Sequence, residues 1–116
     1  MSDGDHALLA IHSQLLRAWG LDTSSTWQAG NPALGQCSVT ALVIQDCLGG
    51  EILKTDVNGA WHFYNEINGK RIDFTMSQFD RPITYDDLPS SRDEALTDCT
   101  QEQCEVLRQR MTGRFA

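Results

Sequence analysis

Residues 51–76, EILKTDVNGAWHFYNEINGKRIDFTM, decide the fold of this chain. They contain three runs of strand-forming residues: 51–57, 60–67 and 70–76. Asn58-Gly59 and Asn68-Gly69 join these runs, and Asn-Gly between two such runs is the strongest short-range signal for a tight hairpin. The stretch therefore predicts an antiparallel three-stranded meander.

The turns also predict which side chains share a face of the sheet. A two-residue turn at Asn68-Gly69 places His62 opposite Thr75 and Tyr64 opposite Asp73. Paired and alternate residues lie on the same face, so the His62 imidazole and the Asp73 carboxylate are diagonal neighbours and are expected to meet. This polar face carries Thr55, His62, Tyr64, Asp73 and Thr75. The opposite face is predicted to belong to the core and carries Trp61, Phe63, Ile67, Ile72, Phe74 and Met76.

Two helices are predicted before the meander. Residues 36–48 are apolar or small at almost every position, and such a helix is buried on several sides. Gly49-Gly50 is expected to end it, with the rest of the chain wrapped around it. Residues 5–19 predict an earlier amphipathic helix, and residues 22–35 predict a loop. The apolar stripe of the earlier helix carries Leu8, Ile11, Leu15, Leu16, Ala18 and Trp19.

An acidic stretch follows the meander. Residues 86–105 hold seven acids against the single base Arg92. Ser-x-x-Glu at 91–94 and Thr-x-x-Gln at 100–103 each fit a capping box, so one or two short helices are expected between residues 91 and 111. The predicted fold is α+β in one domain over residues 1–116. A buried central helix packs on a three-stranded meander, with helices at both ends of the chain.

Composition excludes several function classes. The 116 residues are 41% hydrophobic and 22% charged, the balance of a soluble domain, and the net charge is −7. An acidic chain lacks the clustered basic surface that nucleic acids and anionic membranes require. The first residues are acidic and do not resemble a secretory signal, so a cytoplasmic location is expected.

The four cysteines differ in their expected roles. Cys37 begins the buried helix, where free N–H groups and the helix dipole favour a thiolate and can stabilise an oxyanion. Cys47 is expected to pack in the core. Cys99 and Cys104 are five residues apart among acids and are expected to be bystanders. No Cys-x-x-Cys or His-x-x-x-His motif is present, so no metal or other cofactor is expected.

The order of Cys37 on a buried helix, His62 on a strand and Asp73 on the next strand resembles transglutaminase-like and papain-like cysteine enzymes. Residues from about Trp27 to Phe79 also resemble the YunG-like family of small bacterial proteins with no established activity. Its most specific matching stretches are Gly35-Gln36-Cys37 and Asp73-Phe74-Thr75. Papain-like enzymes place their oxyanion glutamine several residues before the cysteine, whereas Gln36 is adjacent to it here.

These features lead to a hypothesis of cysteine-dependent acyl transfer on an amide or ester of a small molecule or peptide. Cys37 is the nucleophile, His62 the general base and Asp73 the residue that orients it. Gln36, Trp27 and Tyr64 are candidates for oxyanion or substrate binding. The main alternative is a non-catalytic binding module with the same fold, and a weaker one is redox sensing by Cys37. The substrate and the oligomeric state are left open.

Overall fold

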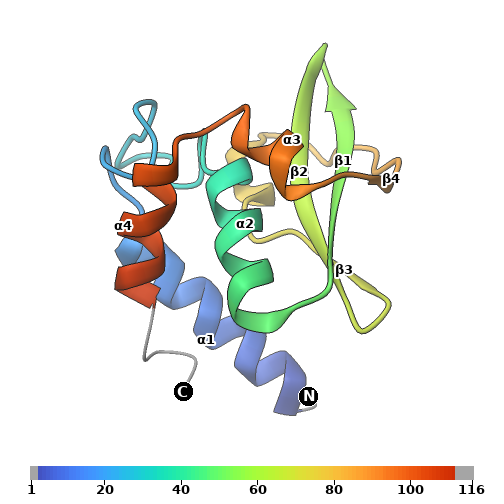
Figure 1. Ribbon diagram of the computed structural model, residues 1–116, viewed down its shortest axis with the longest axis horizontal. Helices are drawn as coiled ribbons and strands as arrows, with labels where there is room; N and C mark the ends of the chain where they lie inside the picture. The colour runs from blue at the N-terminus through green and yellow to red at the C-terminus, as the bar shows by residue number, and fades with distance from the viewer. Residues whose placement is uncertain (1–2, 112–116) are drawn as a thin grey trace.

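The computed structural model describes residues 3–111, with side chains from residue 6 onward, and shows an α+β fold (Figure 1). Its helices are α1 (Asp3–Ala18), α2 (Cys37–Leu48), α3 (Arg92–Leu96) and α4 (Gln101–Met111), with a short 3-10 helix at Met76–Gln78. Its strands are β1 (Glu51–Val57), β2 (Ala60–Ile67), β3 (Lys70–Ile72) and β4 (Leu88–Pro89). They form one antiparallel sheet in the order β3-β2-β1-β4.

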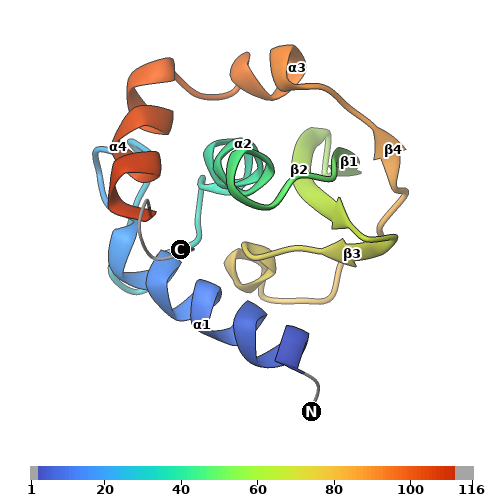
Figure 2. The ribbon, with the colours of Figure 1, turned by 60° about the horizontal axis from the view of Figure 1, so that its bottom comes forward.

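Helix α2 lies in the middle of the fold, as its apolar sequence predicts. Figure 2 shows it nearly end-on, with α1, α3, α4 and the sheet arranged around it. Every residue from Cys37 to Ile44 is buried, whereas the last turn reaches the surface. The positive φ values of Gly49 and Gly50 end the helix and turn the chain into β1.

Both predicted hairpins are confirmed. Asn58 and Asn68 have φ of 54° and 53°, and the glycine after each also has positive φ, as tight two-residue hairpin turns require. The register places Thr55 opposite His62 and Asn65 opposite Ile72, which agrees with the pairing derived from the turns. The sequence therefore positions His62 correctly on the sheet.

The predicted strand 70–76 is wrong beyond Ile72, where β3 ends. The Asp73 side chain accepts the Thr75 N–H at 3.0 Å, and this local turn replaces the next pair of the ladder. Two residues assigned to the core face, Trp61 and Met76, are 45% and 63% exposed. Met76 lies in the 3-10 helix that follows this turn, so it no longer shares the strand's core face.

A fourth strand was not predicted from the sequence. Leu88–Pro89 pairs with Leu53 and Lys54 at the free edge of β1. The strand has only two residues and includes a proline, which is tolerated at an edge but carries no strand signal. The sheet therefore has four strands and not three.

The C-terminal helices begin where the capping residues predict. Ser91 Oγ accepts the Glu94 N–H at 3.1 Å at the start of α3. Thr100 and Gln103 form a complete capping box at α4, with reciprocal bonds of 3.0 and 2.9 Å. In α1, Leu15, Ala18 and the following Trp19 are buried, but Leu16 is 43% exposed and does not widen the apolar stripe. Over the described part of the chain, no helix has the length and apolar character needed to cross a membrane.

Candidate functional site

The predicted meeting of His62 and Asp73 is present and is buried. His62 Nε2 lies 2.6 Å from Asp73 Oδ2, and each side chain is 3% exposed. Tyr85 donates its hydroxyl to the same oxygen at 2.8 Å. Asp73 Oδ1 accepts the N–H and the hydroxyl of Thr75 at 3.0 and 3.2 Å. Four hydrogen bonds thus converge on one carboxylate.

This arrangement fixes the orientation of the His62 ring. A carboxylate surrounded by donors is an acceptor, so Nε2 of His62 carries the proton of their shared hydrogen bond. In a neutral ring the lone pair then lies on Nδ1. Nδ1 is buried and has no hydrogen-bond partner within the described residues. Asp73 therefore holds the ring through Nε2 and leaves Nδ1 as the nitrogen without a partner among the described residues.

A segment that we call the strap, residues 79–87, covers the face of the sheet that bears His62. Phe79 meets the His62 ring edge-on, with centroids 4.9 Å apart. The Tyr64 hydroxyl donates to Asp87 Oδ1 at 2.8 Å, and the hydroxyl of fully buried Thr55 donates to the Thr84 carbonyl at 3.0 Å. The strap thus covers the His62 site through an aromatic contact and hydrogen bonds.

Helix α2 packs against β2 and brings Cys37 to that strand. Because β3 stops opposite Asn65, β2 before Asn65 has no β3 partner. There the Phe63 N–H donates to Cys37 Sγ. The sulfur therefore contacts the peptide that directly follows His62, although no hydrogen bond joins the sulfur to His62 Nδ1 in this structure.

The expectation that Cys37 is a thiolate is wrong for this closed arrangement. The residue is only 7% exposed, and burial raises the pKa of the thiol to about 12. The Phe63 N–H opposes this rise, and the carboxylates of Asp98 and Asp73 add to it. Desolvation of a charge outweighs the helix dipole at this site. Cys37 is consequently a protonated thiol at neutral pH.

The other predicted site residues are buried or partly buried, and of them Tyr64 contacts His62. Gln36 is fully buried; its Oε1 lies 2.9 Å from Thr23 Oγ1, while its Nε2 has no partner in the described part of the chain. Trp27 is partly buried against the core. Tyr64 is 1% exposed, and its ring stacks near His62 at 5.8 Å. Gly35 approaches Thr26 rather than an open space, since an added Cβ would lie 1.9 Å from Thr26 Oγ1.

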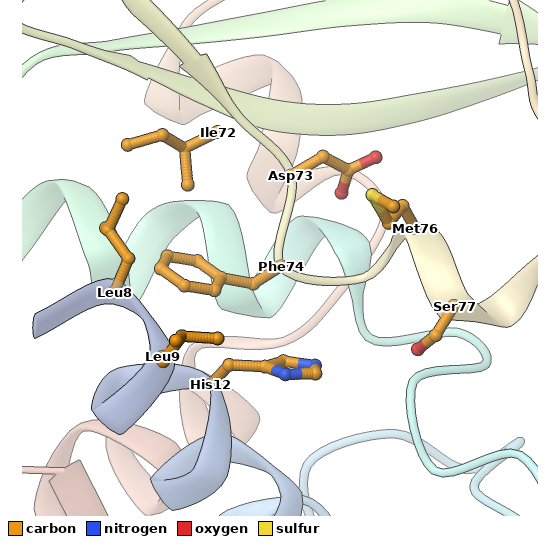
Figure 3. Close-up of a pocket in the computed structure, with 8 residues that line it drawn as sticks. All are labelled: Leu8, Leu9, His12, Ile72, Asp73, Phe74, Met76 and Ser77. Atoms are coloured by element: carbon orange, nitrogen blue, oxygen red, sulfur yellow. The ribbon is translucent and has the colours of Figure 1, made fainter. Parts of the chain in front are cut away.

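Two surface hollows lie beside the site. One is an apolar hollow of about 500 Å³ between α1 and residues 72–77. Figure 3 shows Leu8, Leu9 and His12 of α1 beside Phe74, whereas the Asp73 carboxylate points away from the leucines. The other, about 520 Å³, lies between the β1–β2 turn and the strap. Neither of these hollows is lined by Cys37 or His62.

Cys99 and Cys104 are neighbours in space, which sequence reasoning missed. Their sulfur atoms are 3.8 Å apart. A five-residue spacing does not match one helix face, but Cys99 precedes α4 and lies in the turn that leads into it. The capping box beginning at Thr100 was the available signal for that turn. Among the described residues, no three or more His, Cys, Asp and Glu side chains are grouped to hold a metal ion.

Comparison with known proteins places the chain in a family. A family model described as YunG protein matches residues 7–116. The chain is 53% identical over 95 residues to the "Uncharacterized protein YunG" of Bacillus subtilis (strain 168), covering 82% of this chain and 83% of that protein. No solved structure matches, so the likeness to transglutaminase-like and papain-like enzymes has no support from a known structure. Since the family match covers nearly the whole chain, this protein belongs to the YunG family.

Proposed function

We propose that this protein is a cysteine-dependent acyl-transfer enzyme that acts on an amide or ester and is closed in the structure described. One observation carries the proposal: Asp73 holds the buried His62 ring through Nε2 at 2.6 Å, while Nδ1 is left without a partner among the described residues. The imidazole belongs to the residue before Phe63, whose N–H contacts the cysteine at the start of α2, and these two groups would supply the base and the nucleophile for acyl transfer.

In the proposed first step, His62 Nδ1 takes the thiol proton as Cys37 Sγ forms a bond to the substrate carbonyl carbon. The Cys37 N–H and Gln36 Nε2 stabilise the resulting oxyanion. The imidazolium, stabilised by Asp73, then gives its proton to the leaving amine or alcohol as the C–N or C–O bond breaks. A thioester on Cys37 remains.

In the second step, His62 Nδ1 removes a proton from water or an acceptor amine, which attacks the thioester carbonyl. The C–S bond breaks, the acyl product leaves, and the sulfur regains its proton from His62. A general base is required because the raised pKa of Cys37 leaves almost no thiolate at neutral pH.

Substrate access requires movement of the residues that bury Cys37 and His62, and the strap is the element best suited to move. The strap is irregular over residues 79–87, and its Asp86 and Asp87 side chains are at the surface. Loops that close an active site commonly exclude water and open for substrate. Binding energy from the substrate would offset the hydrogen bonds lost to Thr55, Tyr64 and Asp73.

The proposal is tested by incubating the protein with a panel of activated esters, thioesters and amides and measuring acylation by intact mass. Wild type is expected to gain one acyl group, and Cys37→Ala to gain none. His62→Gln is expected to lower the rate by about 10²–10⁴-fold, the usual contribution of a general base.

Cys47→Ala is the matched control, because Cys47 lies at the opposite end of α2 and is only partly buried. It should acylate at the wild-type rate. Equal acylation of Cys37→Ala and wild type, or an unchanged rate in His62→Gln, would refute the proposed mechanism. A native-like circular dichroism spectrum of each variant shows that a loss of acylation is not caused by unfolding.

A binding module is the second candidate function, and the apolar hollow beside Phe74 favours it. Leu9 is 57% exposed at this hollow, while Leu16 is 43% exposed on α1 outside it. Anilinonaphthalene sulfonate should therefore bind wild type and Leu16→Glu alike but bind Leu9→Glu more weakly. Equal fluorescence in all three proteins would exclude the hollow as a site for apolar ligands.

A further inference from the structure

Cys99 and Cys104 form a close pair of thiols that the proposed acyl transfer does not use. Their sulfur atoms are 3.8 Å apart, and Cys99 Sγ is also 3.7 Å from the Ala95 carbonyl. A disulfide requires a sulfur–sulfur distance of about 2.0 Å, so the two atoms have to approach by less than 2 Å. The pair is therefore near the geometry of a cross-link without forming one.

The two cysteines sit in different environments. Cys104 is 4% exposed and lies in the first turn of α4, whereas Cys99 is partly exposed in the linker between α3 and α4. The sulfur–sulfur hydrogen bond with Cys104 lowers the pKa of Cys99, as does the Ser38 side chain, while burial and Asp98 oppose this effect. The same contact raises the pKa of Cys104. Cys99 is accordingly the more nucleophilic and more accessible thiol of the pair.

The backbone around the pair allows the final approach. Residues 97–100 are not helical, so Cys99 can move without breaking a helical hydrogen bond of its own. The capping box of Thr100 and Gln103 fixes the start of α4 and hence the backbone of Cys104. A surface hollow of about 240 Å³ is lined in part by Cys104, Arg92 and Arg108 and not by Cys99, which is itself only partly buried and is reached by a small oxidant from the surface.

We propose that Cys99 and Cys104 are a peroxide-reactive dithiol, in which Cys99 reacts first and Cys104 closes an intramolecular disulfide. The Cys99 thiolate attacks one oxygen of hydrogen peroxide, the O–O bond breaks, and the departing hydroxide takes a proton from solvent to give water. Cys104 sulfur then attacks the Cys99 sulfenic acid, forming the S–S bond and releasing a second water. Two thiols lose two electrons and the peroxide gains them. The proposal is independent of Cys37.

Tryptic mapping tests this directly, because one peptide, residues 93–108, contains Cys99 and Cys104, and another, residues 18–54, contains Cys37 and Cys47. The folded protein is treated with one equivalent of hydrogen peroxide at neutral pH, alkylated and digested. Peptide 93–108 is expected to lose two hydrogen atoms and take up no alkylating agent, and dithiothreitol should restore both thiols. Peptide 18–54 should keep both thiols alkylatable.

Variants assign the two roles. Cys104→Ser should accumulate a Cys99 sulfenic acid that dimedone traps, whereas Cys99→Ser should leave Cys104 reduced. Cys47→Ser is the matched control and should form the disulfide at the wild-type rate. We expect Cys99 to react at least about tenfold faster than Cys47, the partly buried thiol whose pKa is raised by its own burial. The proposal is overturned if Cys47 is oxidised first, or if wild-type peptide 93–108 remains fully alkylatable when peroxide has been consumed.

Discussion

The two faces of the β-sheet are buried by different means. The face toward α2 is covered by apolar side chains, among them Leu42, Val43 and Phe63, which are at most 2% exposed. The opposite face carries Thr55, His62 and Tyr64, equally buried but held by hydrogen bonds to the strap and to Asp73. An apolar face gains free energy directly on burial, whereas a polar face stays buried only if its groups are satisfied. The difference shows that the two faces are held by different interactions, and that the polar face carries the His62–Asp73 pair while Cys37 belongs to α2 on the other side.

The polar face should be the more sensitive to loss of a single group. Asp73→Ala removes the acceptor of four hydrogen bonds and leaves buried His62 Nε2 and the hydroxyl of half-buried Tyr85 without this partner. We expect the free energy of unfolding in urea to fall by about 3–5 kcal/mol, because two donors lose their acceptor at about 1–3 kcal/mol each. Asp73→Asn, which keeps one side-chain oxygen, should lose less. A loss under about 1 kcal/mol, the size of one ordinary hydrogen bond, would show that the polar face does not depend on Asp73.

A substitution on the apolar side of the sheet gives the loss of stability with which Asp73→Ala is compared. Leu42 is fully buried in α2, and Leu42→Ala should lower the free energy of unfolding by about 3 kcal/mol through lost transfer energy and the cavity that remains. Acylation of Cys37 by the ester panel, measured on the folded fraction, should be unchanged in rate. A large change in that rate would mean that the packing of α2 around Leu42 controls the position of Cys37.

Cys37 should make stability depend on alkaline pH. Burial raises the pKa of its thiol from 9.0 to about 12, so between these values the folded state binds a proton that the unfolded state has released. Stability is therefore complete below pH 9 and falls by about 1.4 kcal/mol per pH unit above it, or about 2 kcal/mol by pH 10.5. Urea unfolding of Cys37→Ala should show a shallower fall over this range.

Tyr64 and Tyr85 contribute to the same alkaline slope from about pH 10, because burial raises the pKa of both phenols. The tyrosine contribution should persist in Cys37→Ala. The effect of the variant on the slope of unfolding free energy against pH is therefore clearest between pH 9 and 10, below the range in which the tyrosines contribute. An identical slope for wild type and Cys37→Ala from pH 9 to 10 would contradict the burial of the Cys37 thiol.

Loss of the hydrogen bond between Tyr85 of the strap and Asp73 should lower the free energy of unfolding least. Tyr85→Phe keeps the aromatic ring but removes the hydroxyl that donates to Asp73 Oδ2. We expect a loss of about 1.5 kcal/mol in urea unfolding, the lower end for a hydrogen bond to a charged group. If the strap is the element that opens, Tyr85→Phe should also acylate Cys37 faster than wild type. A slower rate would assign the strap to substrate binding instead.

The local parts of the fold follow from local sequence. The Asn-Gly turns require positive φ at both positions, and this requirement sets the register of β1, β2 and β3. That register is enough to predict that His62 and Asp73 lie on one face of the sheet. The uniform apolar character of residues 37–44 likewise predicts a helix enclosed by the rest of the chain. These features depend on contacts between residues close in sequence or on simple periodicity.

Features that arise from contacts between distant segments could not be predicted in this way. The end of β3 at Ile72, the edge position of Leu88–Pro89 and the cover of the strap each depend on where another part of the chain lies. The same holds for the protonated Cys37, because its pKa is governed by burial and not by its place at the start of a helix.

The four cysteines illustrate this division. Helix polarity and spacing in the chain predict the packing of Cys47 against the core and the placement of Cys37 at the start of α2. The contact between Cys99 and Cys104 exists because the α3–α4 linker turns back on the first turn of α4. Turn chemistry and hydrophobic periodicity depend on residues close in the sequence, so the sequence alone determines them. Desolvation and side-chain proximity are properties of the assembled core, so only the tertiary structure decides them.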